Sequence, residues 1–309
     1  MRRRVRNPIA AAFESRARPL RATWRAGNSI SKMLHVATVH WRSPAWIDPQ
    51  LRYLRRFAPA DTKVWASLDG ISDEHFGRFD AAMSLSAESD DPVRHADKLN
   101  ELARRITVDA EPDDRLLFLD GDAFPIAPLA GLFDEPDSLI AVRRAENVGD
   151  QQPHPCFSLT TVRFWNDIGG DWRRGYAWQN SRGTWVTDVG AELLRELRKR
   201  DLGWRELLRM NTTDLHPLYY AIYGDPQRGP VVYHHGAGFR ARRSRADDAP
   251  KPAIIPNRVP VLGRAERSLR WRLRKRKISG TRHQQAAARQ DEQVRAWIAQ
   301  DDNIADRFV

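Results

Sequence analysis

Short apolar runs alternate with amphipathic stretches along the middle of the chain. The runs are rich in β-branched residues, as buried strands are, and they occupy residues 34–40, 62–68, 81–85, 115–119, 138–142 and 231–233. The amphipathic stretches repeat apolar residues every three or four positions, which predicts helices, at residues 48–57, 94–108 and 189–200. Apolar strands separated by helices predict an α/β fold with a mainly parallel sheet flanked by helices.

The distribution of charge divides the chain into a body and two basic extensions. Residues 1–32 carry nine basic residues and one acidic residue, and residues 240–277 carry fourteen against three. The intervening residues 33–239 carry 24 basic and 31 acidic residues, so the net charge of +11 over 309 residues belongs to the extensions. We therefore expect a basic N-terminal extension, one domain at 33–240, and a Pro-rich linker with a basic helical extension at 241–309.

The segregated charge argues against nucleic acid as a partner, because nucleic-acid-binding cores present basic residues on their folded faces. In helical form, the basic segment 264–277 would either lie on an anionic membrane surface, at about 1 kcal/mol per basic side chain, or be solvated. No apolar run approaches the length of a membrane-spanning helix. The single cysteine, Cys156, excludes an intramolecular disulfide. We expect a cytoplasmic location, with the extensions holding the protein at the inner face of the membrane.

Two carboxylates follow the apolar run 115–119. Asp120 and Asp122 flank Gly121, which lets the backbone bend so that both side chains converge on one divalent cation. They leave the carboxyl end of a predicted strand, where open α/β sheets bind their ligands. The alternative is that one aspartate caps the next turn and the other is merely exposed.

A pair of histidines follows the last predicted strand. His234 and His235 are adjacent, so their side chains point to opposite faces and one of them faces the ligand-binding edge of the sheet. A neutral imidazole is a suitable third ligand for Mn²⁺. The alternative is that one ring packs in the core and the other is exposed.

These residues, in this order, resemble the GT-A-fold glycosyltransferases, in which a D-x-D motif ends a strand and holds a divalent metal against the diphosphate of a nucleotide-sugar. The resemblance covers about two thirds of the chain. It implies a GT-A-like, Rossmann-type sheet, Mn²⁺ or Mg²⁺ as cofactor, a nucleotide-sugar donor and a glycan or glycolipid acceptor. His235-x-x-Gly238 is similar to an H-x-x-G element of the retaining members, which implies that His235 joins Asp120 and Asp122 as a metal ligand. Arg240 comes one residue earlier than the lysine of that element.

The same resemblance implies where the donor binds. The end of the first strand is similar to the site of the nucleotide base and ribose, and the helix before the D-x-D motif is similar to one that presents a basic residue to the donor. The lysine on that helix could also be an ordinary surface residue. The residues so implied are Thr38, His40, Asp69, Arg94, His95, Lys98 and Asp120.

Asp188 is the candidate for the reacting carboxylate. An inverting transferase needs a carboxylate that removes the proton of the acceptor hydroxyl, whereas a retaining one needs a group beneath the anomeric carbon, and the sequence leaves both open. Thr187 or Asp188 could instead cap the helix that follows. Phe164 and Trp165 are candidates either for an acceptor-side wall or for the core.

Two other functions compete with this interpretation. A haloacid-dehalogenase-like phosphatase also carries Asp-x-Asp after an apolar strand, but its motif lies near the start of the chain, and Phe124 stands where it has Thr or Val. A non-enzymatic adaptor would bind membranes or nucleic acid through its basic tails. That alternative leaves the aspartate and histidine motifs unexplained, so the sequence favours a metal-dependent glycosyltransferase.

Overall fold

A computed structural model of the chain shows the fold. It describes residues 32–85, 92–133, 138–212, 219–236, 281–300 and 304–307. The basic segment 264–277, most of both extensions, Gly238 and Arg240 lie outside the described residues. In the described part of the chain, none of the helices combines the length and apolar character that crossing a membrane requires.

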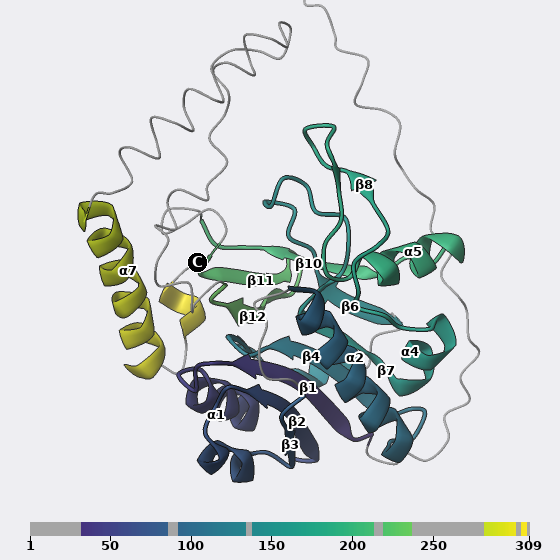
Figure 1. Cartoon of the computed structure of the whole chain (residues 1–309), viewed down its shortest axis with the longest axis horizontal. Helices are drawn as coiled ribbons and strands as arrows, with labels where there is room; N and C mark the ends of the chain where they lie inside the picture. The colour runs from purple at the N-terminus through teal and green to yellow at the C-terminus, as the bar shows by residue number, and fades with distance from the viewer. Residues whose placement is uncertain are drawn as a thin grey trace, which may run out of the picture.

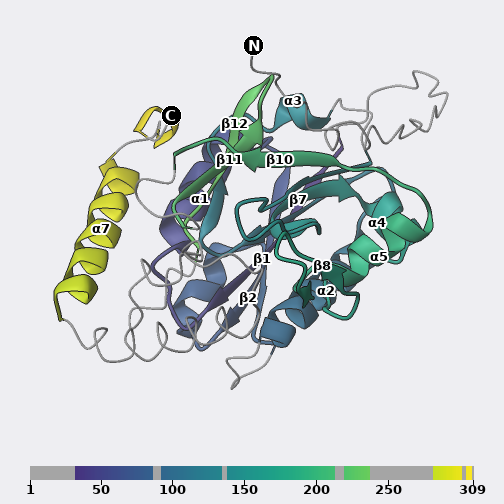
Figure 2. The ribbon, with the colours of Figure 1, turned by 90° about the horizontal axis from the view of Figure 1, so that it is seen from above.

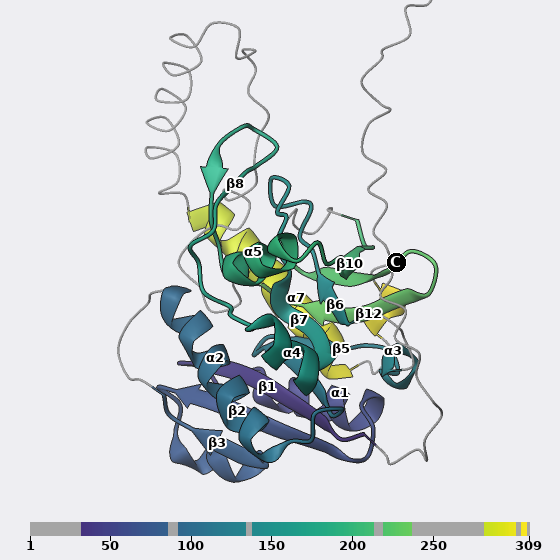
Figure 3. The same cartoon turned by 90° about the vertical axis from the view of Figure 1, so that its right-hand side faces the viewer.

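A ten-stranded sheet forms the centre of the molecule (Figure 1), in the order β3-β2-β1-β4-β7-β6-β10-β11-β12-β5. Its strands are β1 (Leu34–Trp41), β2 (Thr62–Asp69), β3 (Ala81–Met83), β4 (Arg115–Asp120), β5 (Ala123–Pro125), β6 (Leu139–Val142), β7 (His154–Thr161), β10 (Arg205–Arg209), β11 (Ala221–Asp225) and β12 (Gly229–His234). A separate hairpin of β8 (Trp178–Gln179) and β9 (Trp185–Val186) projects from the body (Figure 3).

The first half of the sheet is parallel and the second half is mostly antiparallel. β3, β2, β1 and β4 run in the same direction. β7 runs against both of its neighbours, β4 and β6, and β10 is again parallel to β6. β11, β12 and β5 continue the sheet in antiparallel order. The expected α/β class, a Rossmann-type sheet flanked by helices, is confirmed; its parallel run is β3, β2, β1 and β4, and the sheet as a whole is mixed.

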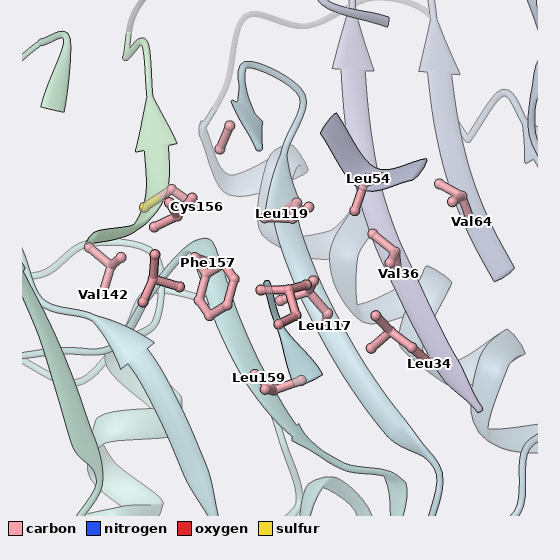
Figure 4. Close-up of a cluster of buried hydrophobic side chains, with 14 of the residues drawn as sticks. Leu34, Val36, Leu54, Val64, Leu117, Leu119, Val142, Cys156, Phe157 and Leu159 are labelled. Carbon is pink, nitrogen blue, oxygen red and sulfur yellow. The ribbon is translucent and has the colours of Figure 1, made fainter. Parts of the chain in front are cut away.

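Helices cover both faces of the sheet because successive side chains of a strand point to opposite sides. On one face, Leu34 of β1 packs in a cluster with Leu51 and Leu54 of α1 (Ile47–Phe57) (Figure 4). On the other face, Ala37 packs with Leu99 of α2 (Pro92–Asp109). The second face is also covered by α4 (Val162–Ile168) and α5 (Ala191–Lys199), while the short helices η1 (Asp73–Arg78) and α3 (Ala130–Phe133) lie in connections.

The C-terminal helices also contribute to the core. α7 (Thr281–Gln300) and η3 (Ile304–Arg307) place Val294, Ile298 and Ile304 in a third cluster with Tyr53 of α1 and Tyr233 of β12. Figure 2 shows α7 beside α1, away from α2, α4 and α5. The far C-terminal segment is thereby attached to the end of β12.

Candidate metal centre

The carboxyl ends of β4 and β12 meet at one edge of the sheet. β4 ends at Asp120, and a turn through Gly121 and Asp122 leads directly into β5. β5 pairs with β12 so that Ala123 lies opposite His234. This pairing brings the D-x-D motif beside a histidine that is distant in the sequence.

Asp120, Asp122 and His234 form a cluster in which one ligand atom of each residue lies within 4.8 Å of the other two. Nε2 of His234 is 3.4 Å from Asp120 Oδ2 and 3.4 Å from Asp122 Oδ1. Two atoms bound to one ion at about 2.1 Å are roughly 3 to 4 Å apart, depending on the angle between them. Two carboxylates and an imidazole at these spacings therefore fit one divalent cation.

Burial and neighbouring charges oppose each other at this cluster. Burial alone would raise the pKa of Asp120, but hydrogen bonds from the His234 and His95 rings hold it well below its usual value. Burial would also raise the pKa of Asp122, but the charge of His234 and its hydrogen bond lower this pKa below its usual value. For His234, burial would lower the pKa, but Cys156 and the two carboxylates raise it well above its usual value. Both carboxylates are therefore ionised at neutral pH and attract positive charge. Because the raised pKa keeps a proton on His234, a cation that binds this ring has to displace that proton.

The second oxygen of Asp120 is fixed by α2. Nε2 of His95 donates to Asp120 Oδ1 across 3.0 Å. This contact follows from the alternation along β4, because Leu116 and Phe118 point to the α2 face and Asp120 continues their row. Of the two basic candidates on this helix whose side chains the structure describes, His95 and Lys98, His95 is the one placed at the D-x-D motif. It leaves Oδ2 of Asp120 for the cluster.

Close packing requires glycine at position 121. A Cβ atom there would lie 2.4 Å from the carbonyl oxygen of Val39 and 2.8 Å from Nδ1 of His40. Such distances are far below van der Waals contact, so the turn can lie against the end of β1 only without a side chain. Close contact with β1, and not only backbone freedom, is therefore the constraint that requires glycine at this position.

His235 points away from the cluster, and this corrects our choice of metal ligand. Its buried ring is hydrogen-bonded through Nδ1 to the Tyr233 hydroxyl at 2.9 Å, and its Nε2 donates to Asp291 Oδ1 in α7 at 2.6 Å. Only one of two adjacent strand residues can face the carboxylates, and the structure places His234 there. The backbone N–H of His235 donates to the carbonyl oxygen of Asp122 at 3.0 Å.

The polar side chains at the end of β1 form hydrogen bonds within the protein. Thr38 and His40 are buried, and both donate to Oε1 of Gln50 in α1. Burial lowers the pKa of His40 to about 4, so its ring is neutral at neutral pH. The sequence signal for Gln50 is its position, because it is a polar residue inside the apolar stripe of an amphipathic helix. Contact of Thr38 or His40 with a nucleotide stays a prediction.

Asp69 and Lys98 form a buried ion pair between β2 and α2. Nζ of Lys98 lies 2.8 Å from Asp69 Oδ2, so Lys98 is not an ordinary surface lysine. Asp69 is fully buried and also accepts from the Ser84 hydroxyl and the Leu85 backbone N–H. The structure thus brings two predicted donor-binding residues together. Arg94 lies in α2, with its side chain outside the described residues, and the contacts of all three with a donor stay predictions.

Asp188 lies apart from the cluster, in the connection before α5. Its Oδ2 is 3.2 Å from Nη2 of Arg144, and its side chain is 38% exposed. α5 begins after Gly190, without a side-chain cap, and Thr187 instead accepts from the backbone N–H of Gly175. The helix-capping alternative for Thr187 and Asp188 is therefore not what the structure shows, and the catalytic role of Asp188 stays a prediction.

Two further residues, His154 and Cys156 of β7, lie beside His234. His154 of β7 has its ring centroid 5.8 Å from that of His234. The positive charge of Arg144 acts to lower the pKa values of both His154 and Cys156. His154 and Cys156 belong to a strand that the apolar pattern did not reveal, so no sequence signal connected them with His234.

Trp165 belongs to the core rather than to an acceptor wall. Its ring packs on Phe118 with 4.6 Å between centroids and stacks on Trp172 at 5.7 Å. Phe164 is partly buried against the same cluster.

No protein-family profile matches the sequence, and no curated protein is similar to it. Among solved structures, the chain is similar to the glycosyltransferase GlyE of Streptococcus pneumoniae, with a TM-score of 0.32 and 17% identity over 45% of this chain and 36% of that one. It is similar to TarS of S. aureus, with a TM-score of 0.33 and 12% identity over 46% of this chain and 30% of that one. It is also similar to the galactosyltransferase LgtC in complex with donor and acceptor sugar analogs, with a TM-score of 0.33 and 12% identity over 53% of this chain and 70% of that one. The chain thus spans about a third of the length of GlyE and TarS.

Proposed function

We propose that the protein is a metal-dependent glycosyltransferase, which moves a sugar from a nucleoside-diphosphate donor to a hydroxyl group of a glycan or glycolipid. The observation that carries this proposal is the cluster of Asp120, Asp122 and His234 at the carboxyl end of β4. Open α/β sheets bind their ligands at this edge. Two ionised carboxylates there attract the divalent cation that a diphosphate group requires.

Three residues would bind the cation, and a fourth would orient one of them. Asp120, Asp122 and His234 would hold Mn²⁺ or Mg²⁺, which when bound neutralises the diphosphate and stabilises it as a leaving group. His95 keeps Oδ1 of Asp120 engaged, so that Oδ2 faces the cluster. The carboxylate therefore reaches the cation from a fixed direction.

The acceptor would bind on the side of Asp188. An exposed carboxylate is able to take the proton of an attacking hydroxyl, and the ion pair with Arg144 fixes the direction of this one. An inverting reaction would use Asp188 in this way. The anomeric configuration of the product, read by NMR, distinguishes it from a retaining reaction.

The nucleotide would lie over the ends of β1 and β2. Thr38, His40 and Asp69 are held by hydrogen bonds within the protein, so we propose that they support this floor and present its backbone to the donor. Lys98 neutralises Asp69 beneath the floor. Arg94, near the start of α2, would add positive charge on the donor side.

A thermal-shift panel of UDP-, GDP- and dTDP-sugars, with and without Mn²⁺, tests the proposal. We expect stabilisation that needs both the cation and one class of nucleotide, since a ligand that binds only the folded state raises its stability. Asp122→Ala should abolish Mn²⁺-dependent nucleotide binding in calorimetry. Asp113→Ala removes an exposed carboxylate that pairs with Arg163 and should leave binding unchanged. Normal binding by Asp122→Ala would sink the metal assignment.

The two alternatives are not favoured. A phosphatase of the haloacid-dehalogenase type carries its nucleophilic aspartate near the start of the chain, whereas Asp120 ends the fourth strand, β4, and Phe124 stands where that motif has Thr or Val. An adaptor that acted only through basic tails would leave the cluster without a role.

A further inference from the structure

Gln50 lies at the centre of a hydrogen-bond network beneath the metal-binding turn. Its side chain is fully buried in α1. Nε2 donates to the carbonyl oxygens of Asp120 at 2.9 Å and Ala123 at 2.7 Å. Oε1 accepts from Oγ1 of Thr38 at 3.1 Å and from Nε2 of His40 at 3.0 Å. These four contacts use the full hydrogen-bonding capacity of a carboxamide.

We propose that Gln50 is a positioning residue for the metal site, because it holds the backbone on both sides of Gly121 and Asp122 and thereby fixes the separation of the two carboxylates. The inference rests on the proposed metal-binding function of this turn. Gln50 itself touches neither the cation nor the donor in this role.

The backbone of the turn depends on such contacts from outside. Gly121 has no side chain with which to anchor it, and its carbon atoms already lie against the end of β1. The backbone N–H of His235 holds the carbonyl oxygen of Asp122. Gln50 holds the carbonyl oxygens of Asp120 and Ala123, so loss of its amide would free the two residues that bracket the loop.

The chemistry of the partners fixes the direction of the carboxamide. Carbonyl oxygens only accept, so the NH₂ group must face Asp120 and Ala123. The oxygen then faces Thr38 and His40, and both of these donate to it. A carboxylate at position 50 could not donate to the turn, and an apolar side chain could serve neither pair. The network therefore also explains why Thr38 and His40 are polar at the buried end of a strand.

Gln50→Met tests this role, since it keeps the shape of the side chain and removes all four hydrogen bonds. We expect the Kd for Mn²⁺, measured by calorimetry, to rise about tenfold or more, as it does when hydrogen bonds behind metal ligands are lost. We also expect the electron paramagnetic resonance spectrum of bound Mn²⁺ to broaden, because the carboxylates would no longer have one separation.

Asn100→Leu is the matched control. Asn100 of α2 is another carboxamide that bridges two elements. It accepts from the Trp172 backbone N–H at 2.9 Å and donates to Asp171 Oδ1 at 2.7 Å, and both of these partners lie in the connection after α4. Its loss should lower thermal stability and leave both the Kd for Mn²⁺ and the spectrum unchanged. Equal effects of the two variants on Mn²⁺ would show that Gln50 acts only through general stability and would overturn the inference.

Thr38→Val provides a second variant in case Gln50→Met does not fold. It removes one of the two donors to Oε1 and should raise the Kd for Mn²⁺ roughly threefold. If the variant that folds, Gln50→Met or otherwise Thr38→Val, shows the wild-type Kd and spectrum, the positioning role of Gln50 is overturned. The proposed metal-binding function would still stand in that case. Failure of the wild-type protein to bind Mn²⁺ would overturn the proposed function and this inference together.

Discussion

Gly121 shows how a single missing side chain shapes the site. The close approach of the turn to Val39 and His40 leaves no room for a Cβ atom, and one of the opposing atoms is a backbone oxygen that cannot rotate away. Any substitution therefore has to push the turn away from β1. The same movement would carry Asp120 and Asp122 away from His234.

Gly121→Ala should accordingly destabilise the protein and weaken Mn²⁺ binding. We expect the free energy of unfolding to fall by about 1–3 kcal/mol, the usual cost of overpacking, as measured by urea denaturation. Gly131→Ala is the control: nothing lies within 4 Å of its added Cβ atom, and it belongs to α3. Alanine there should stabilise by about 0.5–1 kcal/mol. A neutral Gly121→Ala would contradict the steric argument.

Residue types indicated the chemistry of the site, but side-chain direction needed the structure. Asp120 and Asp122 were identifiable because carboxylates at a strand end are a strong pattern. His234 and His235 could not be separated, because alternation says that they differ in direction and not which of them faces Asp120. The contact of Gln50 with the metal-binding turn could not be predicted, because its partners there are backbone carbonyl groups far along the chain.

At the scale of elements, the predicted strands were those with uninterrupted apolar residues. β1 and β4 are almost entirely buried, so their composition alone reveals them. β7, with the sequence HPCFSLTT, mixes proline and hydroxyl residues into a strand that is equally buried. Its antiparallel direction, and the three-residue β5, depend on tertiary pairing that no local pattern encodes.

A partly buried hydrogen bond between Asp291 and His235 links α7 to the end of β12. Asp291→Ala should lower the free energy of unfolding by about 1–3 kcal/mol, because it removes an acceptor from a buried ring nitrogen. Asp291→Asn retains an acceptor oxygen and should behave more like the wild type in the same urea titrations. The exposed neighbour Glu292 provides the control, Glu292→Ala. Equal stability of all three variants would mean that this hydrogen bond does not contribute to the docking of α7.

At the scale of the whole molecule, positive charge and the candidate site are separated along the sequence. The cluster lies in the acidic body, whereas the basic residues concentrate at 1–32 and 240–277, nearly all of which lies outside the described residues. We propose that the extensions serve location, through anionic lipid headgroups, and that the body carries the chemistry. This division makes the two functions separable by mutation.

Replacing Arg270, Arg272 and Arg274 with Gln should weaken binding to phosphatidylglycerol-containing vesicles. At about 1 kcal/mol for each basic residue, the loss is roughly a hundredfold, measured by vesicle sedimentation at low salt. Mn²⁺ binding in solution should not change. If the variant bound vesicles as well as the wild type does, these arginines would be solvated and would not contact the membrane.

During synthesis, Asp120 and Asp122 leave the ribosome long before His234 does. A chain that stops ahead of β12 carries both carboxylates but lacks the imidazole and the strand that pairs with β5. Because contacts between segments so distant in sequence form slowly, the complete set of ligands assembles only when the last strand of the sheet docks. A cation bound there would stabilise the folded sheet with β12 in place, and it would not contribute to the early steps of folding.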